Sequence, residues 1–348
     1  MRSSRTILAV VALTGAAALV PSSPAAAAGA PAFVTGPGNG ESPDVHVYDN
    51  AGQLISSFTA GGVKAGARVA AADVNGDGSP EVIVATGPGV PSQVVVQSLN
   101  GVFNGSFTPF GGFSGGVNVA AGDVDGDGQA EIVTAADTGG GPHVIVWEYA
   151  GFGLRQRTSW YAYDTGFRGG VRVAVANGVG RGQVITATGP GGGPHVRLWD
   201  VGTSGARDAG GWFAYAPSWT GGVNVAAGLV DGVRSVVTGV GAGGGPHVRV
   251  FSTNGAVRHE FFAYAPGFGG GVNVAVSGAQ GPGAIVVGPA AWAGPHVKAL
   301  TSSGVTVLEF FAYAANPING VNVATFAGGS SSNTNQNSSN QNGSTTSF

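Results

Sequence analysis

The stretch Gly115–Val133, GGVNVAAGDVDGDGQAEIV, contains the pattern on which the rest of the chain is built. Val117, Val119 and Ala121 alternate with small or polar residues, which is typical of a short β-strand. The segment DVDGDG then places a carboxylate at every second position, with glycines between, ahead of a second apolar run. Such a turn directs oxygen atoms inward, as a site for a hard cation such as calcium requires. We therefore predict a strand, a calcium-binding loop and a second strand.

A second copy of this loop lies in Gly66–Val84. The predicted ligands are Asp73, Asn75, Asp77, Ser79 and Glu81 in the first loop and Asp123, Asp125, Asp127, Gln129 and Glu131 in the second, with Ser79 and Gln129 acting through their backbone carbonyls. These loops are not EF-hands, because the last acid stands at the ninth position and strands flank the loop. Oxygen-only ligands disfavour zinc and copper. We expect two calcium ions per chain; solvated Asp-Gly turns without a metal are the alternative.

The pattern recurs with a period of about 50 residues, the size of a repeat that forms one propeller blade. The strand core VNVA, or a variant of it, is centred on Val69, Val119, Val173, Val225, Val274 and Val323. A second anchor, GPHV or a variant, places its valine at Val45, Val94, Val144, Val196, Val248 and Val297. Each unit holds four short apolar runs separated by Gly, Pro or Asn turns, which predicts a four-stranded blade.

The two ends of the repeat array complement each other. Residues 32–58 contain the second, third and fourth strands of a unit, whereas 320–326 is a lone first strand. Joined, they complete one blade and bring the count to six. We predict an all-β, six-bladed β-propeller of four-stranded blades, with one blade closed jointly by the N- and C-terminal strands. Because neighbouring blades cover each sheet, we expect both faces of the inner strand and of the aromatic FFAY strand to be buried.

The order of these motifs resembles the FG-GAP or VCBS repeat of integrin-α-like propellers. Phe268-Gly269 stands where that family has "FG", and Thr86-Gly87-Pro88 stands near its "GAP". The resemblance covers roughly residues 32–327. It implies calcium in the loop between the first and second strands and ligand binding on the opposite face. The chain departs from the family in its count of six blades rather than seven, in Glu81 and Glu131 where Asp is common, and in the loss of the loop from four blades.

The two termini are read as segments outside the propeller. Residues 1–30 have the features of a secretory signal peptide, with Arg2 and Arg5 before the apolar run Thr6–Val20 and small residues at 26–28. A membrane anchor is the disfavoured alternative, because the run is short for a bilayer span. We expect a secreted monomer with a propeller over 31–327 and no membrane span after signal removal. Residues 328–348 form a Ser/Asn/Gln-rich tail that we expect to be disordered, either a spacer to the cell wall or without function.

Composition excludes several function classes. The chain of 348 residues has a net charge of −3, so it lacks the basic footprint of a nucleic-acid-binding protein. It contains no Cys, no Gly-x-Ser-x-Gly and no HExxH, so no known catalytic set appears. We therefore favour a binding or adhesion module for an extracellular glycan or protein. A secreted polysaccharide-cleaving enzyme and a purely structural protein are the alternatives.

Three further groups of residues are candidates for ligand binding or for blade packing. Trp219 and Trp292 are expected in loops opposite the calcium loops, as platforms for a ligand or packed under the glycine-rich loops. The histidines that follow Gly-Pro could bind ligand, could form a ring of metal ligands or, as we favour, satisfy the same local contact in each blade; they are His143, His195, His247 and His296. One position of the innermost strand is polar in every blade. Its side chains either line the central channel or, as we favour, form hydrogen bonds between blades. The residues at this position are Arg68, Asn118, Arg172, Asn224, Asn273 and Asn322.

Overall fold

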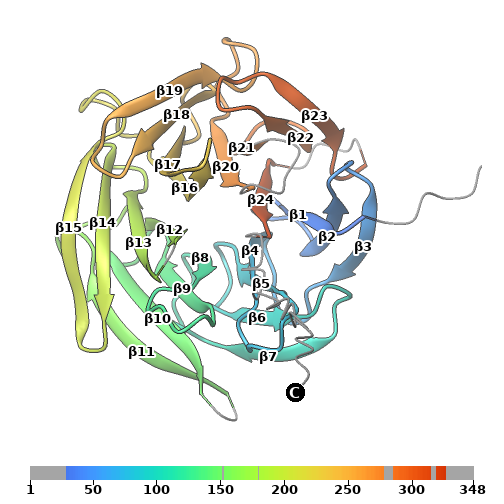
Figure 1. The fold of residues 1–348 in the computed structure, drawn as a ribbon, viewed down its shortest axis with the longest axis vertical. Helices are drawn as coiled ribbons and strands as arrows, with labels where there is room; N and C mark the ends of the chain where they lie inside the picture. The colour runs from blue at the N-terminus through green and yellow to red at the C-terminus, as the bar shows by residue number, and fades with distance from the viewer. Residues whose placement is uncertain (1–28, 151–152, 179, 278–284, 315–318, 327–348) are drawn as a thin grey trace, which may run out of the picture.

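The computed structural model describes residues 29–150, 153–178, 180–277, 285–314 and 319–326, and all regular elements in these ranges are strands. They form six four-stranded antiparallel sheets arranged as blades around a central axis (Figure 1). This confirms the predicted all-β, six-bladed β-propeller. Within the same ranges there is no helix long and apolar enough to cross a membrane.

Each blade is named here by its innermost strand and is given from the axis outward. The β4 blade comprises β4 (Ala67–Ala72), β5 (Glu81–Thr86), β6 (Val94–Gln97) and β7 (Phe103–Phe107). The β8 blade comprises β8 (Val117–Gly122), β9 (Glu131–Ala136), β10 (His143–Ala150) and β11 (Gly153–Tyr161). The β12 blade comprises β12 (Val171–Gly178), β13 (Gly180–Thr188), β14 (His195–Gly202) and β15 (Gly205–Phe213).

The other three blades follow the same order. The β16 blade comprises β16 (Val223–Val230), β17 (Val233–Val240), β18 (His247–Ser252) and β19 (Val257–Phe262). The β20 blade comprises β20 (Val272–Val276), β21 (Ile285–Pro289), β22 (His296–Leu300) and β23 (Thr306–Phe311). The β24 blade comprises β24 (Val321–Thr325), β1 (Pro31–Pro37), β2 (Asp44–Asp49) and β3 (Leu54–Thr59).

The β24 blade joins the two ends of the chain, as predicted. Its strand order is β24-β1-β2-β3, and β24 pairs antiparallel with β1, so that Val323 lies opposite Thr35 and Val321 opposite Pro37. Both Val321 and Phe33 are buried. The pairing satisfies the backbone groups of β24 and β1 and removes two exposed sheet edges from the ring.

The expectation that both faces of the aromatic fourth strand are buried is wrong. Strands β5 and β9 are buried along their whole length, but β19 and β23 alternate between exposed and partly buried residues. Phe262 and Phe311 are 54% and 64% exposed. Because blades radiate from an axis, they diverge with distance from it, and the outermost strand is no longer covered on both faces (Figure 1).

The fourth strand also ends earlier than the FFAY motif suggests. Strand β19 stops at Phe262, and Ala263 and Tyr264 leave the sheet toward the next blade. There the Tyr264 hydroxyl donates a hydrogen bond of 2.7 Å to the carbonyl oxygen of His296. Three more junctions use the same tyrosine contact, made by Tyr163, Tyr215 and Tyr313. The motif therefore ends a strand and fastens one blade to the next.

The polar ring of the innermost strands lines a central cavity of about 90 Å³ and also joins the blades. Each ring asparagine donates its side-chain amide to a backbone carbonyl at the start of the next inner strand, at 2.8–2.9 Å; the four pairs are Asn118 to Val171, Asn224 to Val272, Asn273 to Val321 and Asn322 to Ala67. Arg68 and Arg172 both form ion pairs with the buried carboxylate of Asp137. The favoured prediction, hydrogen bonding between blades, is confirmed.

Candidate functional site

The two acid loops lie next to each other at one end of the propeller. Loop one (residues 73–81) joins β4 to β5, and loop two (residues 123–131) joins β8 to β9. The amide of Ala130 in loop two donates to the carbonyl oxygen of Asp73 in loop one at 3.1 Å. The side-chain amide of Gln129 donates to the carbonyl oxygen of Val74 at 2.6 Å. The loops are therefore connected by direct hydrogen bonds across the boundary between their blades.

The same local turn forms in both loops because the sequence places an acceptor before two glycines. In loop one, the carboxylate of Asp73 accepts hydrogen bonds from the amides of Gly76 and Gly78, at 2.7 and 2.8 Å. In loop two, Asp123 accepts the equivalent pair at 2.6 and 3.0 Å. Gly76 and Gly78 have φ values of +77° and +86°, which glycine adopts without the clash that a Cβ would cause. The sequence pattern thus sets the shape of each loop.

A buried glutamate closes each loop. Glu81 and Glu131 are the first residues of β5 and β9, and each is only 2% exposed. Their carboxylates accept hydrogen bonds from the amides of Val74 (3.0 Å) and Val124 (2.8 Å). Burial, together with the neighbouring aspartate charges, raises the pKa of the Glu131 carboxyl to about 8, and burial likewise raises the pKa of Glu81. A cation at this position would offset the cost of the buried negative charge.

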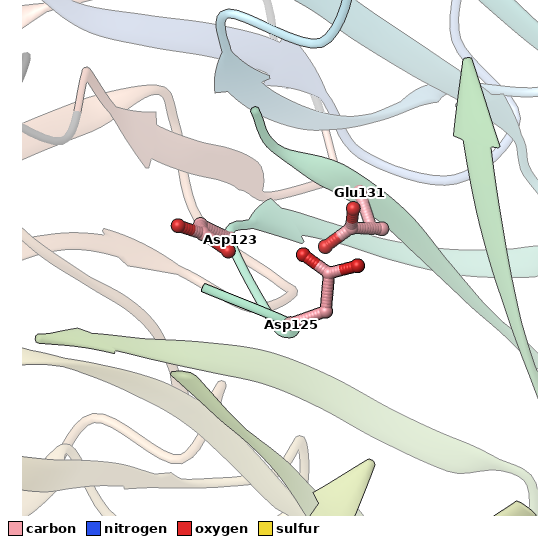
Figure 2. A group of neighbouring side chains, drawn as sticks. All are labelled: Asp123, Asp125 and Glu131. Atoms are coloured by element: carbon pink, nitrogen blue, oxygen red, sulfur yellow. The ribbon is translucent and has the colours of Figure 1, made fainter. Parts of the chain in front are cut away.

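Three carboxylates converge in loop two. Asp123, Asp125 and Glu131 each present an oxygen atom, and these three atoms all lie within 4.8 Å of one another. Figure 2 shows the carboxylates of Asp125 and Glu131 facing each other, with Asp123 beside them. Calcium binds oxygen ligands at about 2.3–2.6 Å, so ligand atoms at such separations can share one ion. This arrangement matches three of the predicted ligands.

The other predicted ligands of loop two, and their counterparts in loop one, form hydrogen bonds within their loops. The amides of Gln129 and Ser79 donate to Asp127 and Asp77, both at 2.8 Å, so these carboxylates support the turn. In loop one, the side-chain amide of Asn75 donates to Glu81 at 2.7 Å and to Asp77 at 3.1 Å. Calcium binding by either loop stays a prediction, as does the participation of the carbonyls of Ser79 and Gln129.

One residue of this site was not predicted. Arg157 on β11 places its Nη1 atom 2.7 Å from Asp125 and 2.5 Å from Glu148 on the neighbouring strand β10. These ion pairs keep the pKa of Arg157 above its usual value. Nothing in the spacing of the acid loop points to an arginine on the outermost strand, because only the pairing of β10 with β11 brings it there.

The two tryptophans occupy different environments. Trp219 is partly buried, packs against the core between the β12 and β16 blades, and donates its indole N–H to the carbonyl oxygen of Gly222 at 2.8 Å. Trp292 is 69% exposed and has a φ of +57°. The equivalent position in the other five blades is a glycine with positive φ in every case: Gly40, Gly89, Gly139, Gly191 and Gly243. A bulky residue in this conformation is unusual and costs about 1 kcal/mol relative to glycine.

Each repeated histidine begins the third strand of its blade beside an exposed aromatic residue of the fourth. The ring centroids of His195 and Phe213 are 5.1 Å apart, and those of His296 and Phe311 are 4.9 Å apart and stacked. His247 pairs with Phe262 in the same way. The main-chain carbonyls of His195, His247 and His296 accept the tyrosine hydrogen bonds described above, which gives these three positions a structural role. The exposed aromatic partners were missed because the whole FFAY strand was expected to be covered.

The molecule thus presents two candidate sites on opposite ends of the ring. Loops one and two join first strands to second strands, whereas Trp292 lies in the loop between β21 and β22, a second and a third strand. Because consecutive antiparallel strands reverse direction, these two kinds of loop emerge at opposite ends of a blade. The expectation that Trp292 lies opposite the acid loops is therefore confirmed.

Comparison with known proteins identifies the repeat. Residues 73–134, which contain both acid loops, match the FG-GAP-like repeat family. No curated protein sequence matches the chain significantly.

Among solved structures, a protein of unknown function from Desulfotomaculum acetoxidans is similar with a TM-score of 0.49 and 14% identity, over 85% of this chain and 89% of that one. A protein from Lactobacillus plantarum has a TM-score of 0.49 and 11% identity, over 80% and 81% of the two chains. A rhamnogalacturonan lyase from Bacillus licheniformis has a TM-score of 0.38 and 14% identity, over 85% and 68%. Similarity at this level carries no conclusion about activity. The chain is therefore a six-bladed β-propeller, and its residues 73–134 form an FG-GAP-like repeat.

Proposed function

We propose that this propeller is a secreted, calcium-binding module that binds an extracellular glycan or protein. The observation that carries the proposal is the conformation of Trp292. Five blades use glycine where the chain needs a positive φ, and the β20 blade alone places an exposed tryptophan there. A strained, solvent-exposed aromatic residue is costly for folding, so its presence supports a role in binding.

The ligand surface of this proposal is the end of the ring that carries Trp292. An indole ring offers a large flat face for a sugar ring or an apolar side chain, with little side-chain entropy to lose on binding. On the outer rim of the same blade, Phe311 is exposed and stacks on His296, which lies 3.2 Å from Glu309. A flat aromatic face beside hydrogen-bonding groups suits a ligand with both apolar and polar edges, such as a glycan.

Calcium has a structural role in this proposal. The acid loops lie at the far end of the ring from Trp292 and hydrogen-bond to each other across a blade boundary. An ion in each loop would neutralise the buried glutamates and stabilise the β4 and β8 blades. Secretion rests on residues 1–30, and residues 1–28 of that segment lie outside the described residues, as does the 328–348 tail.

The proposal is tested with Trp292→Gly, which installs the residue used by the other blades. The substitution removes the aromatic platform and relieves the backbone strain, so we expect unchanged or slightly higher thermal stability together with loss of binding on a glycan array and to cell-wall material. Phe103→Ala is the matched control, because Phe103 is also an exposed aromatic residue but lies on β7 of a different blade.

Two results would contradict the proposal. One is retention of full binding by Trp292→Gly. The other is shortening of a polysaccharide by the purified protein, measured as release of new chain ends, which would favour the enzyme alternative over a binding module.

A further inference from the structure

A second candidate binding site is an open cleft at the end of the ring that carries the acid loops. Its volume is about 730 Å³, and it lies where the β12 blade meets the β16 blade. It is lined by the start of β13, by the tip of the β14–β15 hairpin and by Arg234 of β17. The hairpin is drawn in yellow in Figure 1. Gly182 also lines this cleft and donates a hydrogen bond to the carbonyl oxygen of Asp123, so the cleft borders loop two.

The cleft carries an excess of positive charge. Arg181, Arg207 and Arg234 line it, against the single carboxylate of Asp200. Arg207 forms an ion pair with Asp200, which also accepts a hydrogen bond from Gln183 at 2.8 Å. In the part of the chain that the structure describes, Arg181 and Arg234 have no ion-pair partner. A pair of uncompensated guanidinium groups in an acidic chain creates a local positive potential that attracts anions.

We propose that this cleft binds an acidic polysaccharide through its carboxylate groups. A guanidinium presents a planar fork of N–H donors that matches a carboxylate in a bidentate geometry. The volume of the cleft exceeds that of one sugar ring and accommodates a short run of a polymer.

Asp200 distinguishes a sugar from other polyanions. Its carboxylate would repel a ligand that carries only negative charges, but it can accept hydrogen bonds from sugar hydroxyl groups. Ser204 and Gln183 add further hydroxyl and amide groups to the lining. None of the described lining residues is aromatic, so the cleft has no platform on which nucleic-acid bases would stack.

This inference does not depend on the proposed role of Trp292, and the experiment separates the two. Binding of a hexauronate prepared from alginate is measured by calorimetry at two salt concentrations. We expect the Arg181→Ala/Arg234→Ala variant to bind at least tenfold more weakly than the wild type, and the wild-type affinity to fall with salt. The Trp292→Gly variant should bind hexauronate as the wild type does.

Arg155→Ala is the matched control. Arg155 pairs with Glu148 across β10 and β11 in the register in which Arg207 pairs with Asp200 across β14 and β15. It lies in the adjacent blade and does not line the cleft, so its substitution should leave the affinity within twofold of wild type. Equal losses in Arg155→Ala and in the double variant would overturn the assignment of the cleft.

Three further outcomes would overturn the chemistry of the proposal. Undiminished binding by Arg181→Lys/Arg234→Lys would exclude bidentate recognition by the arginines, since lysine keeps the charge but loses the fork. Tighter binding of a sulfated dextran hexamer would exclude preference for carboxylates. Equal binding of a hexaglutamate peptide would exclude a requirement for sugar hydroxyl groups.

Discussion

Loops one and two share a backbone geometry but satisfy their buried glutamates in different ways. In loop one, the third position is Asn75, whose amide donates to Glu81. In loop two, the third position is Asp125, which cannot donate, and Arg157 from the outer strand supplies the nearest positive charge. The buried carboxylate of loop one therefore receives a hydrogen bond from the third position of its own loop, whereas the third position of loop two adds a negative charge beside Glu131. We therefore expect loop two to depend more strongly than loop one on a bound cation.

The largest expected effect is the loss of a calcium site. Asp125→Ala removes a charged ligand and one of the three converging carboxylates, so calorimetric titration of the metal-free protein should show one calcium site instead of two. The equivalent change in loop one, Asn75→Ala, removes a neutral ligand and should weaken its site about tenfold without abolishing it. Two calcium sites in Asp125→Ala would show that Asp125 is not a required ligand of loop two.

Calcium should also stabilise the fold. If the ion binds only the folded state, each site adds about 2.7 kcal/mol at a hundredfold excess over Kd, or roughly 5 °C in Tm. Scanning calorimetry with and without a chelator should show this shift in Tm. In Asp125→Ala, only the shift that calcium causes at loop one should remain. A melting curve that is indifferent to the chelator would contradict calcium binding at both loops.

Asn75→Asp gives loop one the charge of loop two. We expect calcium affinity at loop one to rise about tenfold, because an ionic ligand replaces a neutral one. Without calcium the same variant should melt at a lower temperature than wild type, because the hydrogen bonds from Asn75 to Glu81 and Asp77 are replaced by charge repulsion. Unchanged affinity in this variant would show that position three is not a ligand.

Loop two should show the stronger response to pH. The pKa of Glu131 is raised to about 8, above its unfolded value, so the folded state binds a proton that the unfolded state has released. The resulting stabilisation of the metal-free protein is present at low pH and is lost as pH rises toward 8. Calcium must displace this proton, so its affinity for loop two should rise up to about tenfold between pH 6 and pH 7. Glu131→Gln should remove this dependence; a wild-type affinity that is flat over the same range would contradict the protonation of Glu131.

The smallest effect is expected from Arg157→Gln. This substitution removes the positive charge beside Asp125. Calcium affinity at loop two should rise about threefold over the wild type, because Arg157 no longer competes with the ion for the carboxylate. Affinity at loop one should not change, which provides an internal control. A weaker site in this variant would mean that Arg157 orients Asp125 for the metal rather than competes with it.

The repeat allowed most of the fold to be predicted. The spacing of VNVA and GPHV determined the number of blades, and the complementary ends predicted the pairing of β24 with β1. The acid spacing likewise predicted Asp123, Asp125 and Glu131 as neighbours. The prediction that both faces of the aromatic FFAY strand are buried was wrong, because its cover depends on how the blades are placed around the axis.

The sequence by itself determined what is local and periodic: the strands, the turns that glycine permits and the carboxylates that one loop brings together. The tertiary structure decided what depends on contacts between elements distant in the chain. Arg157 reaches Asp125 only because β11 pairs with β10, and the arginine cleft exists only because Arg234 of one blade faces the hairpin of another. The strain at Trp292 also became visible only in the structure, because a backbone angle is set by the loop that contains it. Periodicity encodes the repeating unit, whereas the junctions between units depend on packing around the ring.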